Sequence, residues 1–361
     1  MKIVNVVGAR PNLIKIAPLM SAYAGYPSIE ALLVHTGQHY DETMSELFFE
    51  QLGIPVPDIN LEVGSASHAV QTAEIMKAFE GVLVDHRPDV VLVVGDVNST
   101  IACGLVAVKL GIRLVHVEAG LRSRDRTMPE EINRILTDAI SDLLFCTEQS
   151  GVDNLIAEGV PRNRIHLVGN VMIDTLLKNK QLADRSPVLD DLGLERRRYA
   201  VLTLHRPSNV DDPATFDRIL DALEVVQREL PIVFPVHPRT RRILADSPLG
   251  RRSEAMPGLR LLDPIGFLDF LKLMSDARIV LTDSGGIQEE TTILKVPCLT
   301  LRENTERPIT TEIGSNRIVG TDTARILDAF RAVMDGKGPP CKVPPMWDGS
   351  AAKRITKILL Q

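Results

Sequence analysis

Short apolar runs, rich in β-branched residues, recur along this chain, and each ends at a glycine or polar cluster that leads into helical spacing. This alternation is typical of repeated βαβ units, whose parallel strands are buried on both faces and therefore consist of continuous apolar runs. The clearest predicted strands cover residues 3–7, 90–94, 114–117, 201–204, 232–236 and 279–282. The sequence therefore predicts an α/β fold with parallel sheets.

A polar segment divides the chain near its middle. Residues 178–198 contain Ser186-Pro187 and end in a charged run, which is typical of a seam between domains. At 361 residues the chain also exceeds the size at which one hydrophobic core usually stops growing. We expect two Rossmann-like, doubly wound domains, residues 1–172 and 173–345, that face a central cleft at the carboxyl ends of their strands.

The C-terminal residues predict one more helix. Ile355, Ile358 and Leu359 are spaced to share one face of a helix within residues 346–361. We expect this helix to pack back on the N-terminal domain, because its apolar face needs a partner.

Composition excludes several classes of protein. Lys and Arg number 41 against 47 Asp and Glu, and the net charge of −6 has the wrong sign for binding nucleic acid or anionic lipid by bulk charge. The four cysteines form no Cys-x-x-Cys pair, so neither a zinc site nor a disulfide framework is indicated. No apolar stretch approaches the ~20 residues of a membrane span, and Gly8 interrupts the first run before a signal peptide could form. We therefore expect a cytoplasmic protein.

The predicted strands of the first half end in ionisable residues. The first strand ends in Gly8-Ala9-Arg10-Pro11 with Lys15 one turn later, a turn that suits an anionic ligand. Asp96 follows the second run and Glu118 follows the third. Considered by itself, Asp96 is explained by a helix-capping role. Two carboxylates at the same edge of one sheet instead indicate a catalytic or binding site.

A third carboxylate, Glu130, has a structural explanation. Thr127 and Glu130 have the spacing of a capping box, and Glu130 can pair with Arg134 one turn later. Taken alone, these relations favour a structural role for Glu130.

Two histidines follow predicted strands in the second half. His205-Arg206 comes after residues 201–204, and His237 comes after residues 232–236. No carboxylate or third histidine lies at ligand spacing, so acid-base work or phosphate contact is favoured over a metal site.

The strongest local signal is Asp283-Ser284-Gly285-Gly286, at a strand end that opens a helix. Its glycines let backbone N–H groups approach a diphosphate closely. An acidic residue in the next turn would repel phosphate, so a sugar hydroxyl pair is its natural partner.

Together these motifs resemble the non-hydrolysing UDP-N-acetylglucosamine 2-epimerases. The resemblance runs in order from residue 3 to about residue 320. The motifs that carry it are Gly-Ala-Arg-Pro with Lys15, Gly-Asp-Val-Asn-Ser-Thr, His-Val-Glu-Ala-Gly-Leu-Arg, Pro-Glu-Glu-Ile-Asn-Arg, Asp-Ser-Gly-Gly-Ile-Gln-Glu-Glu and Thr-Glu-Arg-Pro. It implies a glycosyltransferase-B type fold, a homodimer, a UDP-N-acetylhexosamine substrate, and no metal or nicotinamide cofactor.

The resemblance also implies a reaction and roles for residues. UDP-N-acetylglucosamine and UDP-N-acetylmannosamine would interconvert by elimination of UDP to a 2-acetamidoglucal and re-addition on the other face. The implied catalytic residues are Asp96, Glu118 and Glu130 around C2 and C3, with His205 at the departing diphosphate. The implied substrate-binding residues are Arg10, Lys15, Arg134, His237, Phe270, Ser284, Gly285, Gly286, Glu290 and Arg317.

The chain departs from many family members at two places near the expected sugar site. It has Ala9 and Asn12 where many members have Thr and Glu, and Ser208 where many have Glu. The Gly-Ala-Arg-Pro form also occurs in epimerases of UDP-2,3-diacetamido sugars, which is one alternative. A glycosyltransferase of the same architecture is another, and a non-catalytic binding protein is a third. The Gln38-His39-Tyr40-Asp41 segment lacks the basic residue that follows Gln-His in members activated by a second substrate molecule.

Overall fold

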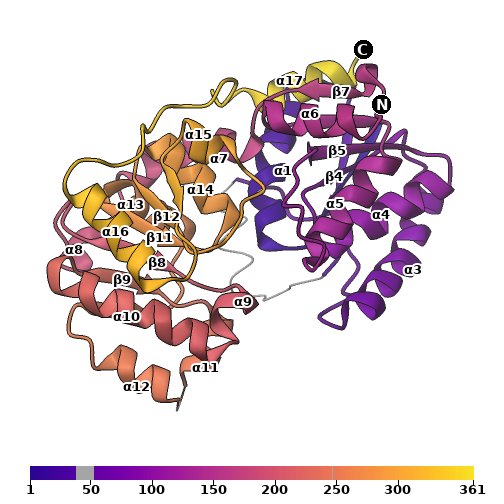
Figure 1. Cartoon of the computed structure of the whole chain (residues 1–361). Helices are drawn as coiled ribbons and strands as arrows, with labels where there is room; N and C mark the ends of the chain where they lie inside the picture. Colours follow the sequence, from indigo (N-terminus) through magenta and orange to yellow (C-terminus); the bar gives the residue numbers. More distant parts are fainter. Residues whose placement is uncertain (38–52, 246) are drawn as a thin grey trace. The chain divides into compact units, whose positions relative to one another are not determined.

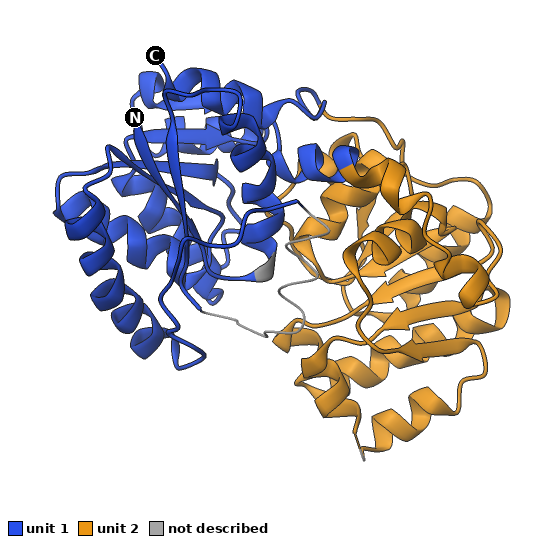
Figure 2. Ribbon diagram, turned by 180° about the vertical axis from the view of Figure 1, so that it is seen from behind, with its two compact units in different colours: residues 1–178, 345–361 blue, residues 179–344 orange. Residues whose placement is uncertain are grey.

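The computed structural model describes residues 1–37, 53–245 and 247–361. The chain forms two compact units, Met1–Lys178 with Pro345–Gln361 and Asn179–Pro344, which we call unit 1 and unit 2 (Figure 2). The boundary expected at residues 172/173 falls inside helix α7 (Val171–Ala183), which spans the division between the units. The segment Gln38 to Asp41 lies outside the described residues.

Unit 1 contains a parallel sheet with the strand order β3-β2-β1-β4-β5-β6-β7 (Figure 1). Its strands are β1 (Lys2–Val7), β2 (Glu30–His35), β3 (Ile59–Asn60), β4 (Val90–Val94), β5 (Arg113–Ala119), β6 (Leu143–Cys146) and β7 (Ile165–Leu167). Its helices are α1 (Arg10–Tyr23), α3 (His68–His86), α4 (Asn98–Lys109), α5 (Pro129–Ile140), α6 (Gln149–Ala157), the 3-10 turn Arg162–Arg164 and α17 (Ala351–Leu359).

Unit 2 contains a second parallel sheet with the order β10-β9-β8-β11-β12-β13. Its strands are β8 (Ala200–Thr203), β9 (Ile232–Pro235), β10 (Leu259–Leu262), β11 (Ile279–Thr282), β12 (Cys298–Thr300) and β13 (Asn316–Ile318). Its helices are α8 (Val188–Asp191), α9 (Pro207–Val210), α10 (Pro213–Glu229), α11 (Pro238–Leu244), α12 (Pro248–Glu254), α13 (Phe267–Asp276), α14 (Gly285–Leu294), α15 (Ile309–Glu312) and α16 (Thr323–Met334).

The prediction of parallel α/β sheets is confirmed, and its cause lies in burial. All five residues of β4 are buried, and the last five of β1 are buried as well. In unit 2, Phe216, Phe234 and Phe330 come from β9 and from helices α10 and α16 and lie in one core cluster. Continuous apolar strands are stable only when helices cover both faces of the sheet.

The strand order reverses once in each sheet, between β1 and β4 in unit 1 and between β8 and β11 in unit 2. At such a reversal the loops that follow the two strands run in opposite directions and leave a crevice at the carboxyl edge, where ligands bind in open α/β sheets. In each unit, the topology therefore selects the ends of the two strands beside the reversal as the place to look for functional residues.

The C-terminal segment belongs to unit 1, where α17 packs against α1. Trp347 is 1% exposed, and its indole Nε1 donates to the carbonyl of Thr147 at 2.9 Å. The Asp174 carboxylate accepts the backbone N–H groups of Ala351 and Ala352 at 3.1 and 2.8 Å, which satisfies the start of α17. The segment is thus anchored by one aromatic residue and one capping carboxylate.

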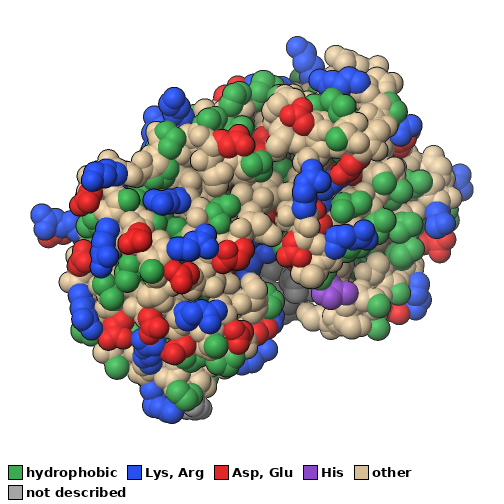
Figure 3. Space-filling model, in the orientation of Figure 1, with side chains coloured by type: hydrophobic (Ala, Val, Ile, Leu, Met, Phe, Trp, Pro, Cys, Tyr) green, Lys and Arg blue, Asp and Glu red, His purple; other side chains and the backbone are tan. Residues whose placement is uncertain are grey.

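Two surface properties bear on function. Among the described residues, none of the helices combines the length and apolarity needed to cross a membrane. Cationic and anionic side chains alternate over the face shown in Figure 3, without a continuous basic area. The basic surface expected of a nucleic-acid-binding protein is missing from that face.

Replacing the buried indole tests the anchor of the C-terminal segment. We expect Trp347→Ala to lower the free energy of unfolding by about 3–5 kcal/mol, because it leaves a cavity and an unpaired carbonyl. Urea unfolding followed by circular dichroism measures this change. Leu360→Ala, at a 38% exposed position, is the control and should change stability by less than about 0.5 kcal/mol. Equal stability of both variants would show that the segment is not anchored through Trp347.

Candidate active site

The turn from β1 to α1 is held by Asn12. Its Oδ1 accepts the N–H groups of Gly8 and Ala9 at 3.2 and 3.0 Å, and its Nδ2 donates to the Val94 carbonyl at 3.0 Å. A Cβ at Gly8 would lie 2.0 Å from the Ser99 hydroxyl oxygen, so only glycine permits this close approach. The turn is therefore fastened to the end of β4. Arg10 is the first residue of α1, and its side chain is outside the described part of the structure.

Lys15, in the second turn of α1, and Glu118, near the carboxyl end of β5, form a buried ion pair. Both side chains are less than 10% exposed. The Lys15 ammonium also lies 3.0 Å from the position that a Cβ on Gly95 would occupy, so it reaches the residue before Asp96. Lys15 thus joins the three strand ends that carry the predicted ionisable residues.

Glu118 has an unusual backbone. Its φ is +74°, and the pairing of β5 with β6 shifts register between Val117 and Ala119. A non-glycine residue in the left-handed region costs on the order of 1 kcal/mol and persists only where its surroundings enforce it. The irregularity turns the Glu118 side chain toward Lys15, and such strain is typical of functional sites.

Asp96 is paired with Arg134 of α5. The Arg134 Nη2 donates to the Asp96 Oδ2 at 2.5 Å, and its Nη1 donates to Glu131 at 2.5 Å. Glu131 also accepts the N–H groups of Ser123 and Arg124. Burial acts to raise the pKa of Glu131, but these hydrogen bonds and the Arg134 charge outweigh it, so the pKa is lowered. Arg134 is therefore a fixed cation that presents Asp96, whose side chain is 27% exposed.

The capping-box prediction is wrong. The N-cap of α5 is Met128, and the Thr127 hydroxyl donates to Asp125 at 2.6 Å instead of capping the helix. The two ion pairs that Arg134 makes within the described residues are with Asp96 and Glu131 and not with Glu130. Pro129 fixes the backbone at the start of this helix and has no N–H that needs a partner. Glu130 is half-buried in the first turn of α5. The capping role and the Arg134 pairing that the spacing favoured for Glu130 are therefore not observed in the part of the chain that the structure describes.

His205 of unit 2 is oriented by Asp283. The His205 Nδ1 lies 2.8 Å from the Asp283 Oδ1, and the same carboxylate accepts the backbone N–H groups of His205 and Arg206. Burial acts to raise the pKa of Asp283, but the hydrogen bond and charge of His205 with the backbone N–H groups outweigh it, so the pKa is lowered. Asp283 is completely buried, whereas His205 is 38% exposed. The imidazole is therefore held from behind, with its Nε2 available for a ligand.

The second histidine lies beside the first. The rings of His205 and His237 have centroids 5.5 Å apart at 42°, and His237 caps α11 through Nδ1, which accepts the N–H of Arg239. Across residues 1–37, 53–245 and 247–361, no group of three or more His, Cys, Asp or Glu side chains is arranged to hold a metal ion.

The start of α14 is open to an anion. Ser284 is its N-cap, and Gly285 and Gly286 form its first turn. A Cβ on Gly285 would lie 2.5 Å from the Arg307 Nη1, so glycine lets this guanidinium reach the helix start. Backbone N–H groups at a helix N-terminus with an adjacent arginine form a phosphate-binding arrangement.

Arg307 is held by Glu306, which also accepts the Arg302 Nη2 at 2.8 Å. Burial acts to raise the pKa of Glu306, but the charges of Arg307, Arg302 and Arg206 outweigh it and hold the pKa well below its usual value. The sequence prediction names Arg317 and omits Arg307, although the Thr-Glu-Arg-Pro motif was the available signal. Arg317 is exposed within the edge strand β13.

Two further predicted binding residues lie on helices of unit 2. Glu290 is buried in α14, in the turn after the glycines, and Phe270 is half-buried in α13. Unit 2 thus brings together His205, His237 and Ser284 to Gly286 near β8 and β11, while unit 1 brings together Lys15, Asp96, Glu118 and Arg134 near β1, β4 and β5.

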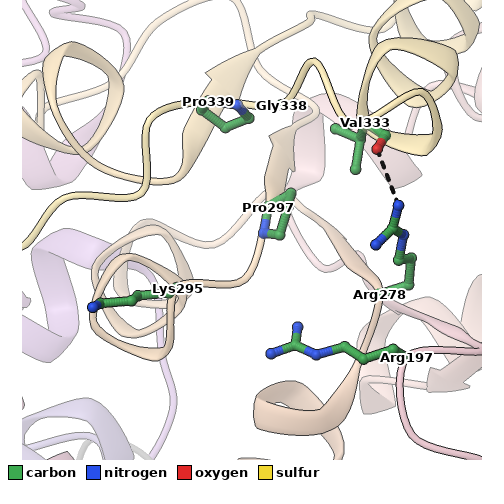
Figure 4. A pocket seen from close by; sticks show the side chains of 8 residues that line it. Arg197, Arg278, Lys295, Pro297, Val333, Gly338 and Pro339 are labelled. Atoms are coloured by element: carbon green, nitrogen blue, oxygen red, sulfur yellow. Dashed lines mark hydrogen bonds between the residues drawn. The ribbon is translucent and has the colours of Figure 1, made fainter.

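A separate cavity of about 370 Å³ lies at the amino ends of β11 and β12 (Figure 4). It is lined by the cations Arg197, Arg278 and Lys295. The Arg278 Nη2 donates to carbonyls at the end of α16, and the Arg197 Nη1 donates to the Ala277 carbonyl at 2.6 Å. These two arginines therefore form hydrogen bonds with backbone carbonyl groups. The cavity lies at the amino ends of the strands, whereas Ser284 follows the carboxyl end of β11.

The two parallel sheets with alternating helices define a glycosyltransferase-B type α/β protein, and the strand-end carboxylates, histidine and glycine turn are consistent with a nucleotide-sugar enzyme. The profile of the UDP-N-acetylglucosamine 2-epimerase family matches residues 22–360, and the chain belongs to this family of isomerases.

Relatives of known name support this assignment. The chain is 41% identical to a UDP-N-acetylglucosamine 2-epimerase of Methanocaldococcus jannaschii, covering 99% of each chain. It is also 41% identical to a UDP-2,3-diacetamido-2,3-dideoxy-D-glucuronate 2-epimerase of Pseudomonas aeruginosa, again over 99% of each.

Solved structures agree. The M. jannaschii enzyme in complex with UDP-GlcNAc and UDP matches with a TM-score of 0.92, covering 100% of this chain and 99% of that one. The Neisseria meningitidis UDP-GlcNAc 2-epimerase bound to UDP-GlcNAc matches with a TM-score of 0.91 at 29% identity, covering 100% of both chains.

The Asp283 contacts predict a pH-dependent effect on stability. Because the pKa of Asp283 is lower in the folded protein than its ordinary 3.8, its carboxylate stabilises the fold above pH 3.8 and loses this effect as the pH falls through the folded value. We expect Asp283→Asn to lower the free energy of unfolding at pH 7 by about 1–3 kcal/mol. The difference from the unsubstituted protein should shrink below about pH 4.

Urea unfolding at a series of pH values measures this difference. Asp184→Asn, at a 48% exposed carboxylate, is the control and should show almost none. A constant difference across the pH range would contradict the predicted role of the ionised carboxylate.

Proposed function

We propose that this protein catalyses reversible epimerisation at C2 of UDP-N-acetylglucosamine to give UDP-N-acetylmannosamine. One observation carries the proposal: Asp96 and Glu118 lie at the carboxyl ends of the adjacent strands β4 and β5, and each is fixed by a buried cation, Arg134 or Lys15. Inversion at carbon requires a group that removes a proton and a group that returns one to the other face. The names and bound ligands of the relatives supply the substrate class.

The chemistry of the sugar favours elimination and re-addition. The C2 hydrogen has no neighbouring carbonyl, so its direct removal would leave an unstabilised carbanion. Departure of UDP builds positive charge at C1 and acidifies C2–H, giving a 2-acetamidoglucal. UDP then adds back to C1 while C2 takes a proton on the opposite face. The enzyme must therefore retain UDP while it is not bonded to the sugar.

Unit 2 provides the groups for retaining UDP. The N-terminus of α14, with Ser284, Gly285 and Gly286, would bind the diphosphate, and Arg307 would add a charge. His205, oriented by Asp283, would donate its Nε2 proton to the departing diphosphate oxygen. Glu290 would bind the ribose hydroxyls, and Phe270 and Arg317 would make further nucleotide contacts together with Arg10 and Lys15 of unit 1. His237 is a proposed lining residue.

Unit 1 provides the groups for proton transfer. Asp96, Glu118 and Glu130 are the proposed acid and base residues around C2 and C3. Lys15 and Arg134 fix the directions of two of them, and Arg10 follows the glycine turn as a further proposed contact. The family resemblance further supports a homodimer that acts in the cytoplasm.

A second candidate is 2-epimerisation of a UDP-2,3-diacetamido sugar. The relative of P. aeruginosa that bears this name is as similar as the M. jannaschii enzyme, at 41% identity. Asn12 replaces a carboxylate of many family members. Its Oδ1 accepts the Ala9 N–H and its Nδ2 donates to the Val94 carbonyl, so the substitution has a structural explanation within the turn. The two substrates must be separated by experiment.

Proton NMR of the purified protein with UDP-N-acetylglucosamine in deuterated water tests the proposal. We expect UDP-N-acetylmannosamine to appear with deuterium at C2. No exchange in a folded protein that binds UDP would reject this substrate, and the same measurement with UDP-2,3-diacetamido-glucuronate would test the second candidate.

Substitutions at the proposed acid and base groups test the roles. We expect Asp96→Asn, Glu118→Gln, Glu130→Gln and His205→Ala each to lower kcat about 10²–10⁴-fold, because each removes a proton-transfer group. Initial rates by NMR measure this, with UDP binding as the check of folding. Asp153→Asn, an exposed carboxylate of α6, is the control and should retain full activity. Near-normal turnover in a folded variant would remove that residue from the mechanism.

A further inference from the structure

His116 lies within the motif that supplies Glu118, and the proposed reaction gives it no role. Its side chain is completely buried in β5. Its Nδ1 lies 2.7 Å from the Asp138 Oδ1, and its Nε2 lies 2.8 Å from the carbonyl oxygen of Gly95. A buried imidazole with a partner at each nitrogen joins two separate parts of the structure.

The partners determine where the hydrogens lie. A carbonyl oxygen only accepts, so Nε2 donates to Gly95. Asp138 already accepts the Gly120 N–H at 3.0 Å and the Arg122 Nη1 at 2.7 Å through its other oxygen, which is the pattern of an ionised carboxylate. The Asp138 Oδ1 faces the His116 Nδ1 at 2.7 Å, so a hydrogen bond joins these two buried side chains.

The pair connects the two strand ends that carry carboxylates. Gly95 directly precedes Asp96, and Gly120 lies two residues after Glu118. The backbone N–H of Gly95 also donates to the Val117 carbonyl at 3.1 Å, so hydrogen bonds tie both sides of Gly95 to β5. Asp138 belongs to α5, the helix that also carries Arg134 and Glu130. One pair of side chains thus fastens β4, β5 and α5 to one another.

The strained backbone at Glu118 needs such a fastening. A residue with φ of +74° relaxes unless neighbouring contacts hold it. On its C-terminal side, Ala119 pairs with Cys146 of β6, and the Gly120 N–H and the Arg122 guanidinium both bind Asp138. The Arg122 Nε and Nη2 are held by Glu158 at 2.8 and 2.6 Å, which fixes this end of the network.

We infer that His116 and Asp138 are a positioning pair that sets the separation and direction of Asp96 and Glu118 for proton transfer at the substrate. This inference rests on the proposed function. The pair does not touch the substrate, and it acts through the backbone at Gly95 and Gly120. Displacement of a reacting group by about 1 Å costs on the order of 100-fold in rate, so loosening this connection lowers kcat.

Two substitutions at His116 separate its hydrogen bonds from its volume. His116→Phe fills the space and removes both hydrogen-bonding nitrogens, whereas His116→Gln keeps an amide that can donate a hydrogen bond. We expect kcat to fall about 100-fold in His116→Phe and to be partly restored in His116→Gln. KM for the UDP-sugar and the Kd for UDP should stay within about threefold, because the groups proposed to hold the diphosphate, the start of α14 and Arg307, belong to unit 2. Thr137→Val is the matched control: Thr137 is a buried neighbour of Asp138 whose hydroxyl donates to the Asn133 carbonyl within α5 at 2.8 Å.

The isotope effect distinguishes positioning from loss of stability. With substrate deuterated at C2, misplaced carboxylates slow the proton-transfer step, so we expect a larger deuterium effect on kcat in His116→Phe than in the unsubstituted protein. Thr137→Val, destabilised to whatever extent, should keep the unsubstituted isotope effect. A fall in kcat with no change in the isotope effect, or full activity in His116→Phe, would overturn the inference.

A measurement without turnover keeps the two proposals distinguishable. Amide hydrogen exchange followed by mass spectrometry should be faster in His116→Phe for peptides covering residues 93–98 and 117–122, with unit 2 unchanged. If the unsubstituted protein does not exchange C2–H, the proposed function fails while the connection between the strand ends is still tested by amide exchange. Unchanged exchange in both peptides would reject the connection itself.

Discussion

The burial of charge at the carboxyl ends of parallel strands is the constraint on which the rest of this structure depends. A parallel sheet gathers its strand ends at one edge, so ionisable side chains placed there meet in a partly dry environment. Leaving one such charge unpaired costs several kcal/mol, and a partner of opposite sign with good geometry offsets that cost. Lys15 with Glu118, Arg134 with Asp96 and Glu131, and His205 with Asp283 all follow this rule.

The pairs are asymmetric in a way that matters for function. Asp283 is completely buried while His205 is 38% exposed, and Arg134 is 4% exposed while Asp96 is 27% exposed. In both pairs the buried member fixes direction and the exposed member can meet a ligand. The two units use different residue types for this purpose. In unit 1 the buried Arg134 cation orients the Asp96 carboxylate, and in unit 2 the buried Asp283 carboxylate orients the His205 imidazole.

Local backbone geometry converts these charges into a defined arrangement. Asn12 fastens the turn after β1 to the end of β4, and the register shift at Glu118 turns a carboxylate that a regular strand would direct elsewhere. Asn12 donates to the Val94 carbonyl, which an ionised carboxylate at this position could not do. The difference from many family members at this position is therefore accommodated within the turn, without an unpaired charge.

The sequence by itself determined the fold class, because continuous apolar runs such as Val90–Val94 are stable only in covered parallel sheets. It also placed Asp96, Glu118, His205 and Ser284 at strand ends, since each comes one or two residues after such a run. Only the tertiary structure decided which charges pair, because Arg134 lies one turn from Glu130 yet binds Asp96, 38 residues away in the chain. The positive φ of Glu118 and the approach of Arg307 to Gly285 were likewise decided by packing between segments distant in sequence, which spacing along one helix or strand does not encode.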